Sequence, residues 1–548
     1  MSGSADLVLT GARVWTGDPS SPWTDSIAVQ GDRVVALGAD ATGELTGPRT
    51  RRFHRPGALV VPGFQDAHVH APFAGRNRLH VWLNDLVGRH AYLDRIAEYA
   101  DANPDLPWII GGGWAMEHFP GGTPSKSDLD AIVPDRPVFL MNRDVHGAWV
   151  NSRALDLAGI GPGTVDPADG RIERDPRTGE ATGTLHEGAA YSFQDLHVPT
   201  PSREDWEAAI LESQGHLHAL GITGWQDAWV TPATLEAYRS LAGSDRLTAR
   251  VVGALWWERH RELDQVSEFL TQRESGRVGN FHPTSVKIMT DGVLENYTGA
   301  LLEPYCDGCG GHTDNHGLSY VEPDLLAAAV TELDRHGFQV HLHAIGDRAV
   351  RNALDAIEAA RDANGAGDNR HHIAHVQVVQ PQDVPRFREL DVVANLQAYW
   401  AQLEPQMEEL TIPFLGRDRA QRQYPFGDLL RSGATLAMGS DWSVTTANPL
   451  EQIEVAVTRI DPENRGNAPF LPEQALPLEV ALRAFTAGSA HVNHDDDAGT
   501  LTVGRRADLA LLDHDVFTSG GPIADARVDL TIAGGRVVFD RADPTHAG

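Results

Sequence analysis

The sequence predicts an α/β protein, namely a (β/α)8 TIM barrel with a large insertion after its first strand, plus a small β-sandwich built from both termini. Strand-like and helix-like segments alternate through the middle of the chain, which is typical of a parallel sheet with crossover helices. Short alternating strands bounded by glycine and aspartate turns occupy both ends. With 548 residues, the chain has room for an enlarged barrel and a satellite domain.

The two ends of the chain have the same style of strand. Residues 5–32 alternate apolar and polar positions in short runs, and residues 506–538 repeat this pattern. Neither end supplies enough strands for a stable sheet by itself. We therefore expect residues 1–57 and 495–548 to form one composite β-sandwich, and residues 58–494 to form the barrel domain.

Eight strand-like segments match the number that closes a barrel. They cover residues 59–68, 222–227, 247–255, 285–290, 339–343, 372–375, 392–397 and 435–439. The first two strands are separated by about 150 residues, far more than an ordinary connection in such a fold needs. We predict that residues 75–215 form an insertion that lies over the mouth of the barrel as a lid.

Composition narrows the class of partner. The formal net charge of −31 would repel nucleic acid phosphates and anionic membrane surfaces. Two cysteines exclude a disulfide scaffold, and the first residues lack the basic and apolar regions of a secretion signal. No apolar run reaches the roughly 18–20 residues that a membrane span needs. We expect a cytoplasmic protein that acts on a small molecule, and a homodimer is compatible with these features.

The first predicted barrel strand ends in two histidines that are two residues apart. His68 and His70 share a face, so they can bind one metal ion together. A lone pair with this spacing is weak evidence for a metal. Four further candidate ligands follow separate strands at their C-terminal ends, where a barrel keeps its chemistry: Lys287, His343, His375 and Asp441.

This ligand set predicts two divalent ions, with zinc as the first expectation. The two histidines of the first strand and Asp441 would hold one ion, and the two later histidines would hold the second. Lys287 would bridge them after its amine adds CO2, because each carbamate oxygen can bind one ion. A metal-bridging hydroxide would attack the substrate carbonyl. Asp441 would pass the proton to the leaving amine.

The same residues lie in motifs that resemble the amidohydrolase superfamily, and more closely its family 3, the branch that contains N-substituted formamide deformylases. The motifs occur, in family order, at residues 62–70, 144–155, 286–292, 343–349, 375, 439–441 and 499–509. The resemblance implies a metal-dependent hydrolase of carbon–nitrogen bonds other than peptide bonds, acting on an amide, N-acyl or N-formyl amine. One departure is Ala374, where the family often has glutamate, and it bears on the substrate rather than on metal binding.

Three alternatives stay open. The enzyme alternatives are a cyclic-amide hydrolase and a mononuclear aminohydrolase, that is, a deaminase of the same superfamily. Deaminases of this superfamily usually place glutamate three residues after the fifth-strand histidine and need no bridging lysine, whereas this chain has Gly346 and Lys287. The third alternative is a non-catalytic relative. Such relatives tend to lose ligands, and all six candidates are present here.

Five residues near the motifs are expected to contact substrate: Trp114, His146, Trp149, Asp291 and Trp442. The tryptophans are chosen because of where their motifs fall, and such side chains can also be core residues. The aspartate can equally bond a turn amide.

A second group of metal-capable residues stands apart: Cys306, Cys309, His312 and His316. Their spacer is shorter than in ordinary zinc modules, so a flexible loop is favoured and a structural ion is left open.

Overall fold

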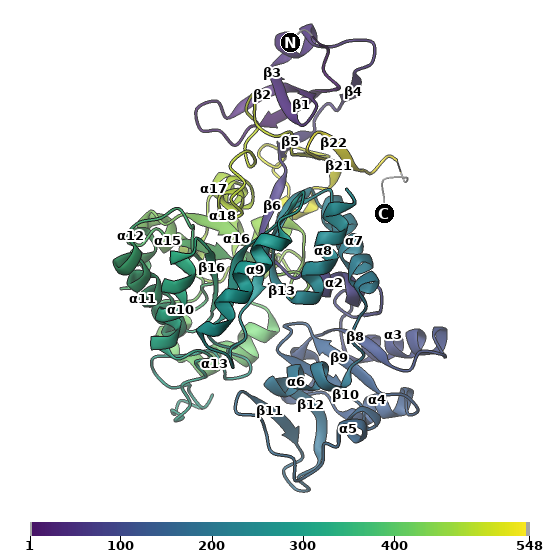
Figure 1. The fold of residues 1–548 in the computed structure, drawn as a ribbon, viewed down its shortest axis with the longest axis vertical. Coiled ribbons are helices and arrows are strands. Elements are labelled where there is room, and N and C mark those ends of the chain that lie inside the picture. The colour runs from purple at the N-terminus through teal and green to yellow at the C-terminus, as the bar shows by residue number, and fades with distance from the viewer. Residues whose placement is uncertain (1–2, 544–548) are drawn as a thin grey trace.

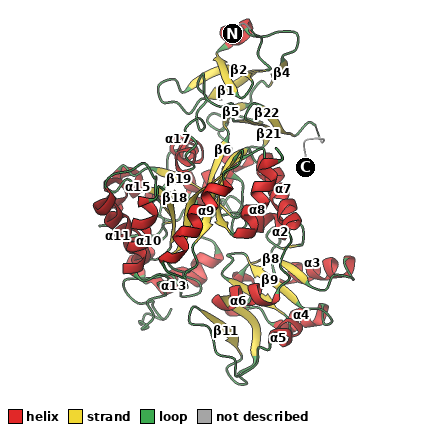
Figure 2. Ribbon diagram, viewed as in Figure 1, coloured by secondary structure: helices red, strands yellow, loops and turns green. Residues whose placement is uncertain are grey.

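A computed structural model describes residues 3–543, which contain three β-sheets (Figures 1 and 2). The purple N-terminal strands and the yellow C-terminal strands meet at one end of the molecule, the barrel lies in the middle, and the blue insertion lies at the other end (Figure 1). The predicted fold class is therefore confirmed: a (β/α)8 barrel with a large insertion, and one small β-domain built from both termini.

The barrel sheet has eight parallel strands in the order in which they occur along the chain. They are β6 (Phe64–Val69), β13 (Ile222–Val230), β14 (Arg250–Trp256), β15 (Phe281–Met289), β16 (Gln339–Ala344), β17 (His372–His375), β18 (Val393–Leu396) and β19 (Leu436–Met438). The first and last strands meet beyond the end of β19, where the Asp441 amide donates to the His68 carbonyl at 2.7 Å. The His70 amide likewise donates to the Trp442 carbonyl at 2.8 Å.

The predicted strand 59–68 is divided in two at Gly63. Its first part, β5 (Leu59–Pro62), pairs with strands of the terminal sheet, and only β6 belongs to the barrel. A Cβ atom at Gly63 would lie 2.5 Å from the Thr223 hydroxyl, so the close approach to β13 requires glycine. The terminal domain therefore extends to Pro62 rather than to residue 57.

The terminal sheet joins both ends of the chain around an apolar core. Its strands are β1 (Leu7–Trp15), β2 (Trp23–Gln30), β3 (Arg33–Leu37), β4 (Arg51–His54), β5, β20 (Leu509–Leu512), β21 (Val528–Ala533) and β22 (Arg536–Asp540), with α1 (Ala39–Glu44) beside them. Strand β20 pairs with β5, so the last segment of the chain adds to the first at the point where the chain enters the barrel.

The insertion has its own six-stranded sheet and two apolar cores. Its elements are β7 (Val81–Trp82), α3 (Arg89–Ala102), β8 (Ile109–Trp114), α4 (Lys126–Ile132), β9 (Val138–Asn142), β10 (Gly147–Val150), α5 (Ser152–Ala158), β11 (Gly170–Arg174), β12 (Ala181–Glu187) and α6 (Gly188–His197). The predicted limits 75–215 are too wide, because α7 (Arg203–Ala219) packs on α2 (Ala71–Arg78) in the layer around the barrel. A Cβ atom at Gly75 would overlap the Ala209 carbonyl, so glycine permits this contact.

Helices surround the barrel strands (Figure 2). The remaining ones are α8 (Pro232–Gly243), α9 (Val266–Gly276), α10 (Pro323–Arg335), α11 (Asp347–Asn364), α12 (Val384–Glu389), α13 (Ile412–Leu415), α14 (Arg417–Ala420), α15 (Phe426–Ser432), α16 (Pro449–Thr458), α17 (Leu478–Arg483) and α18 (Ser489–Val492). Asn448 caps α16, and its side-chain oxygen accepts from the Leu450 amide at 3.1 Å. Within residues 3–543, no helix combines the length and the apolar character needed to cross a bilayer.

Candidate metal centre

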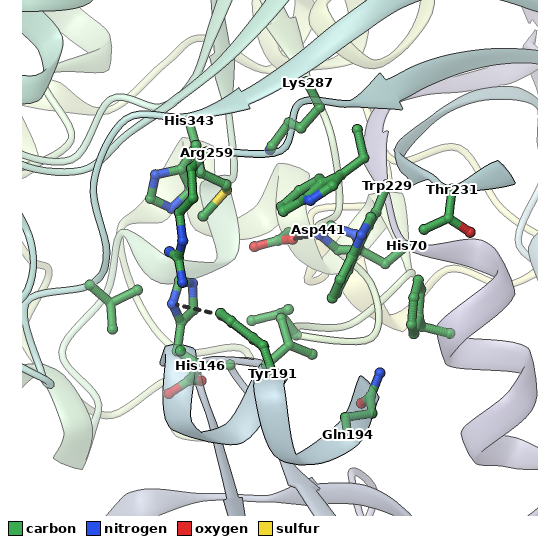
Figure 3. Close-up of a pocket in the computed structure, with 18 of the residues that line it drawn as sticks. His70, His146, Tyr191, Gln194, Trp229, Thr231, Arg259, Lys287, His343 and Asp441 are labelled. Carbon is green, nitrogen blue, oxygen red and sulfur yellow. Dashed lines mark hydrogen bonds and ion pairs between the residues drawn. The ribbon is translucent and has the colours of Figure 1, made fainter. Parts of the chain in front are cut away.

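The six predicted ligands meet at the C-terminal mouth of the barrel. They come from β6 and the residue after it, from β15, β16 and β17, and from the loop after β19, and all line one cavity of about 430 Å³ (Figure 3). All six residues are buried, and none is more than 7% exposed: His68, His70, Lys287, His343, His375 and Asp441. Strand ends of a closed barrel converge by geometry, which explains how residues so distant in sequence share one cavity.

Three of these side chains form a compact group suited to a metal ion. Asp441 Oδ1 lies 3.3 Å from His68 Nε2 and 3.1 Å from His70 Nε2. One ligand atom from each residue lies within 4.8 Å of the other two. Imidazole nitrogen and carboxylate oxygen are the ligands that Zn²⁺ prefers among these side chains, so the donor set fits a divalent ion.

The other three side chains lie beside this group. Asp441 Oδ2 is 3.9 Å from His375 Nδ1, and the His375 ring lies 4.6 Å from the His343 ring. Burial lowers the pKa of Lys287 to about 7. Neutral amine is therefore available at neutral pH, and only neutral amine can add CO2.

A hydrogen-bond chain through the barrel interior fixes the tautomer of His68. The Gln226 amide donates to Gln339 Oε1 at 2.9 Å, so Gln226 Oε1 is free to accept from His341 Nδ1 at 2.7 Å. Burial holds the pKa of His341 well below its usual value, so His341 is neutral and its Nε2 accepts from His68 Nδ1 at 2.8 Å. His68 Nε2 then keeps its lone pair, and it makes no hydrogen bond within the described part of the chain.

Asp291 plays the same part for His343. It accepts from His343 Nδ1 at 3.0 Å, which leaves His343 Nε2 for a metal. Its two oxygens also accept from the backbone amides of Ala300, Ile345 and Gly346. Because Asp291 is fully buried and does not line the cavity, its predicted contact with substrate is wrong, and it orients the candidate ligand His343 instead.

The Gln226 chain leads to a testable expectation. Gln226→Met removes the acceptor that orients His341, so His68 loses its fixed tautomer, and we expect divalent-metal affinity to fall by about 10- to 100-fold. Competition with a chelating dye measures this affinity. Gln65→Met is the matched control, because Gln65 is equally buried but bonds Thr223 and Asn493. Equal metal affinity in the two variants would remove the positioning role of Gln226.

The three tryptophans that were predicted to contact substrate lie elsewhere in the structure. Trp114 and Trp149 lie in an apolar core of the insertion and donate to the Leu140 and Ser125 carbonyls. Trp442 is buried against the His216 ring at 4.7 Å. None of the three lines the cavity, whereas His146 does. The direction of a side chain in the insertion depends on how its sheet packs, and the motif positions do not reveal this.

Aromatic residues that were not predicted from the sequence form one wall of the cavity. Trp229 stacks on Phe73 at 4.3 Å and lies 4.9 Å from Trp256. Both tryptophans line the cavity, with Tyr191 and Arg259 nearby (Figure 3). Trp229 and Trp256 stand at the C-terminal ends of β13 and β14, so the strand-end rule that located the metal ligands would also have found them.

The cysteine-containing loop has no comparable ligand geometry. Cys306 Sγ lies 3.9 Å from His312 Nδ1, and Cys309 is exposed. Among residues 3–543, the only close group of three potential ligand atoms is the one formed by His68, His70 and Asp441. The loop is therefore not assigned a structural ion.

An eight-stranded barrel with buried imidazoles, a carboxylate and a lysine at its C-terminal mouth defines the class of metal-dependent barrel hydrolases. The amidohydrolase family model matches residues 56–539, so the chain belongs to the amidohydrolase family. The family resemblance inferred from the motifs is thereby confirmed.

Individual relatives agree with this placement. The Arabidopsis thaliana protein LONG AFTER FAR-RED 3 is 30% identical over 98% of this chain and 92% of its own length. An N-substituted formamide deformylase from Arthrobacter pascens is 28% identical over 99% of both chains. The crystal structure of an uncharacterized metal-dependent hydrolase from Pyrococcus furiosus has a TM-score of 0.70 and 26% identity, over 93% of this chain and 99% of that one.

Proposed function

We propose that this protein hydrolyses a carbon–nitrogen bond of a small amide, either an N-acyl or an N-formyl amine, and that it uses two divalent ions, most simply Zn²⁺. The observation that carries the proposal is the convergence of six buried ligand candidates from separate strands on one cavity. The similarity to an N-substituted formamide deformylase over 99% of both chains supports the same bond type.

Each ligand candidate has a defined task in this proposal. His68, His70 and Asp441 would hold one ion, and His343 and His375 would hold the second. Lys287, carboxylated by CO2, would bridge them. When bound, the ions would supply an activated water and polarise the substrate carbonyl.

Asp441 is the proposed proton carrier. Its Oδ1 lies toward His70 and its Oδ2 toward His375, so the carboxylate lies between imidazoles of the two proposed ion sites. Oδ2 would take the proton from the attacking water and return it to the amine nitrogen as the C–N bond breaks. Burial tends to raise the pKa of Asp441, but the hydrogen bond from His70 and the proximity of His375 outweigh burial and lower it, so Asp441 is a carboxylate at neutral pH.

The geometry at Gly346 argues against the deaminase alternative. This position follows the fifth-strand histidine by three residues, where deaminases of the superfamily usually have glutamate. A Cβ atom at Gly346 would overlap the Ala300 carbonyl, so no larger side chain fits there without movement of the backbone. The position that supplies this glutamate in such deaminases therefore has no side chain here, which favours amide hydrolysis.

The cavity wall suggests which kind of substituent the substrate nitrogen bears. Trp229, Trp256 and Phe73 present aromatic surface next to the ligand candidates. Apolar and aromatic walls select substrates by burying apolar area. We infer that the nitrogen bears an apolar or aromatic substituent, and that polar amides of similar size are poorer substrates.

A paired assay tests the proposal. N-formyl and N-acetyl derivatives of benzylamine and of ethanolamine are offered to protein loaded with zinc and to protein treated with a chelator. We expect amine release only from the metal-loaded protein, with the benzylamine derivatives preferred, and about two metal equivalents by elemental analysis. Equal turnover after metal removal would contradict metal dependence, and one firmly bound ion would favour the mononuclear alternative.

A further inference from the structure

A histidine–glutamate pair of the insertion faces the candidate metal centre. His146 precedes β10 and Glu187 ends β12, so neighbouring strands of the insertion sheet bring the two residues together, and His146 lines the cavity. Figure 3 shows His146 and Tyr191 on the insertion side of the cavity, across from Lys287. The His146 ring lies 5.9 Å from the ring of His343, so the pair is next to the reacting centre.

Glu187 holds His146 in one orientation. Glu187 Oε2 accepts from His146 Nδ1 at 2.9 Å, and Oε1 accepts from the Thr298 hydroxyl at 2.8 Å. Glu187 is 1% exposed, and a buried carboxylate is stable only when it is paired and hydrogen-bonded. Burial alone would lower the pKa of His146, but the charge and hydrogen bond of Glu187 outweigh burial and raise it. The pair therefore favours the imidazolium form, in which His146 Nε2 also carries a proton.

The remaining nitrogen of His146 points to the cavity. Nε2 makes no hydrogen bond to any described residue and is not among the buried unpaired atoms, while His146 lines the cavity. The backbone beside the pair is unusual as well, because Val145 and Glu187 have φ of 57° and 52°. Residues other than glycine rarely adopt this left-handed conformation, and such positions cluster at functional sites.

The barrel fixes the pair from the other side. The Thr298 hydroxyl and the Asn296 amide, from the loop after β15, bond Glu187 and the His146 carbonyl respectively. The insertion is thus anchored to the barrel at the point where it supplies a charged donor. A donor fixed before the reaction stabilises developing charge without reorganisation.

We propose that His146, held by Glu187, donates a hydrogen bond from Nε2 to the carbonyl oxygen of the bound amide and stabilises the negative charge of the tetrahedral intermediate. This inference rests on the proposed amide hydrolysis and adds a catalytic residue from the insertion, with Glu187 as its positioning residue. It assigns the insertion a part in the reaction besides covering the cavity.

The first test is kinetic. We expect His146→Asn to lower kcat by about 10²- to 10³-fold with little change in KM and in metal content. Glu187→Gln, which keeps the shape of the side chain, should lower kcat less. The matched control is His186→Asn, because His186 is a buried histidine of β12 whose Nε2 lies 3.4 Å from Glu173, outside the cavity. Unchanged kcat in His146→Asn, or a loss confined to KM, would overturn the inference.

The second test needs no turnover. Methylphosphonate, a small tetrahedral anion, is titrated into metal-loaded protein by calorimetry, and thermal unfolding shows whether each variant is folded. We expect binding to be about 10- to 100-fold weaker in His146→Asn than in wild type or His186→Asn, because one charge-assisted hydrogen bond is lost. Equal affinity overturns the inference. If the wild type binds the anion in this way but cleaves no amide, the proposed function fails and the anion-donor role of His146 stands.

Discussion

Asp441→Asn is expected to lower kcat by about 10²- to 10⁴-fold while fold and bound metal are retained. Asparagine keeps an oxygen where Asp441 Oδ1 lies 3.1 Å from His70 Nε2, so a ligand atom remains available. Its amide group cannot take a proton from water or give one to the leaving amine. Turnover is measured by amine release and metal content by elemental analysis of the same sample.

The matched control for this variant is Asp383→Asn. Asp383 is also a buried carboxylate, but its partners Arg351 and Arg386 lie on the outer helices, away from the cavity. We expect the control to lose stability and to keep its turnover. Unchanged turnover in Asp441→Asn would remove the proton-transfer role. Simultaneous loss of metal and activity would instead leave Asp441 as a ligand alone.

The barrel and its ligand candidates could be predicted from the sequence because two simple regularities apply to them. Strands buried on both faces occur as short apolar runs, and parallel strands place their C-terminal ends together. These rules located His343 and His375 at the cavity. The predicted limits of the first barrel strand are wrong because one extended segment contributes a strand to each of two sheets. Only the contact of Gly63 with Thr223 marks the boundary between these strands.

Residues outside the barrel strands were predicted less well. Trp114 and Trp149 lie in motifs near the catalytic face, but the insertion uses them for its own core. A shift of one position along a strand turns a side chain to the other face, so sequence alone does not show which tryptophans face the cavity. Glu187 was missed for a related reason, since its importance depends on pairing with a residue 41 positions away.

The second prediction with a large expected effect is the carboxylation of Lys287. This residue is one of only two lysines in a chain with 45 basic residues, and it is 1% exposed in β15. If its neutral amine adds CO2, it forms a carbamate and releases one proton, and the two carbamate oxygens can each bind an ion. We expect native mass spectrometry to show the added mass of one CO2, and protein equilibrated with ¹³C-bicarbonate to show one carbamate carbon signal by NMR.

Lys287→Ala should remove that signal, one of the two metal equivalents, and at least about 10²-fold of turnover, because an electrostatic contact at the reacting centre is lost. The space left by the side chain should admit propionate, whose carboxylate replaces the carbamate oxygens, so added propionate should restore the second ion and part of the turnover. Lys126→Ala is the control, because Lys126 begins α4 in the insertion and is not among the residues that line the cavity. An unmodified Lys287 beside two bound ions would contradict the carbamate, since a bare amine cannot bridge two cations.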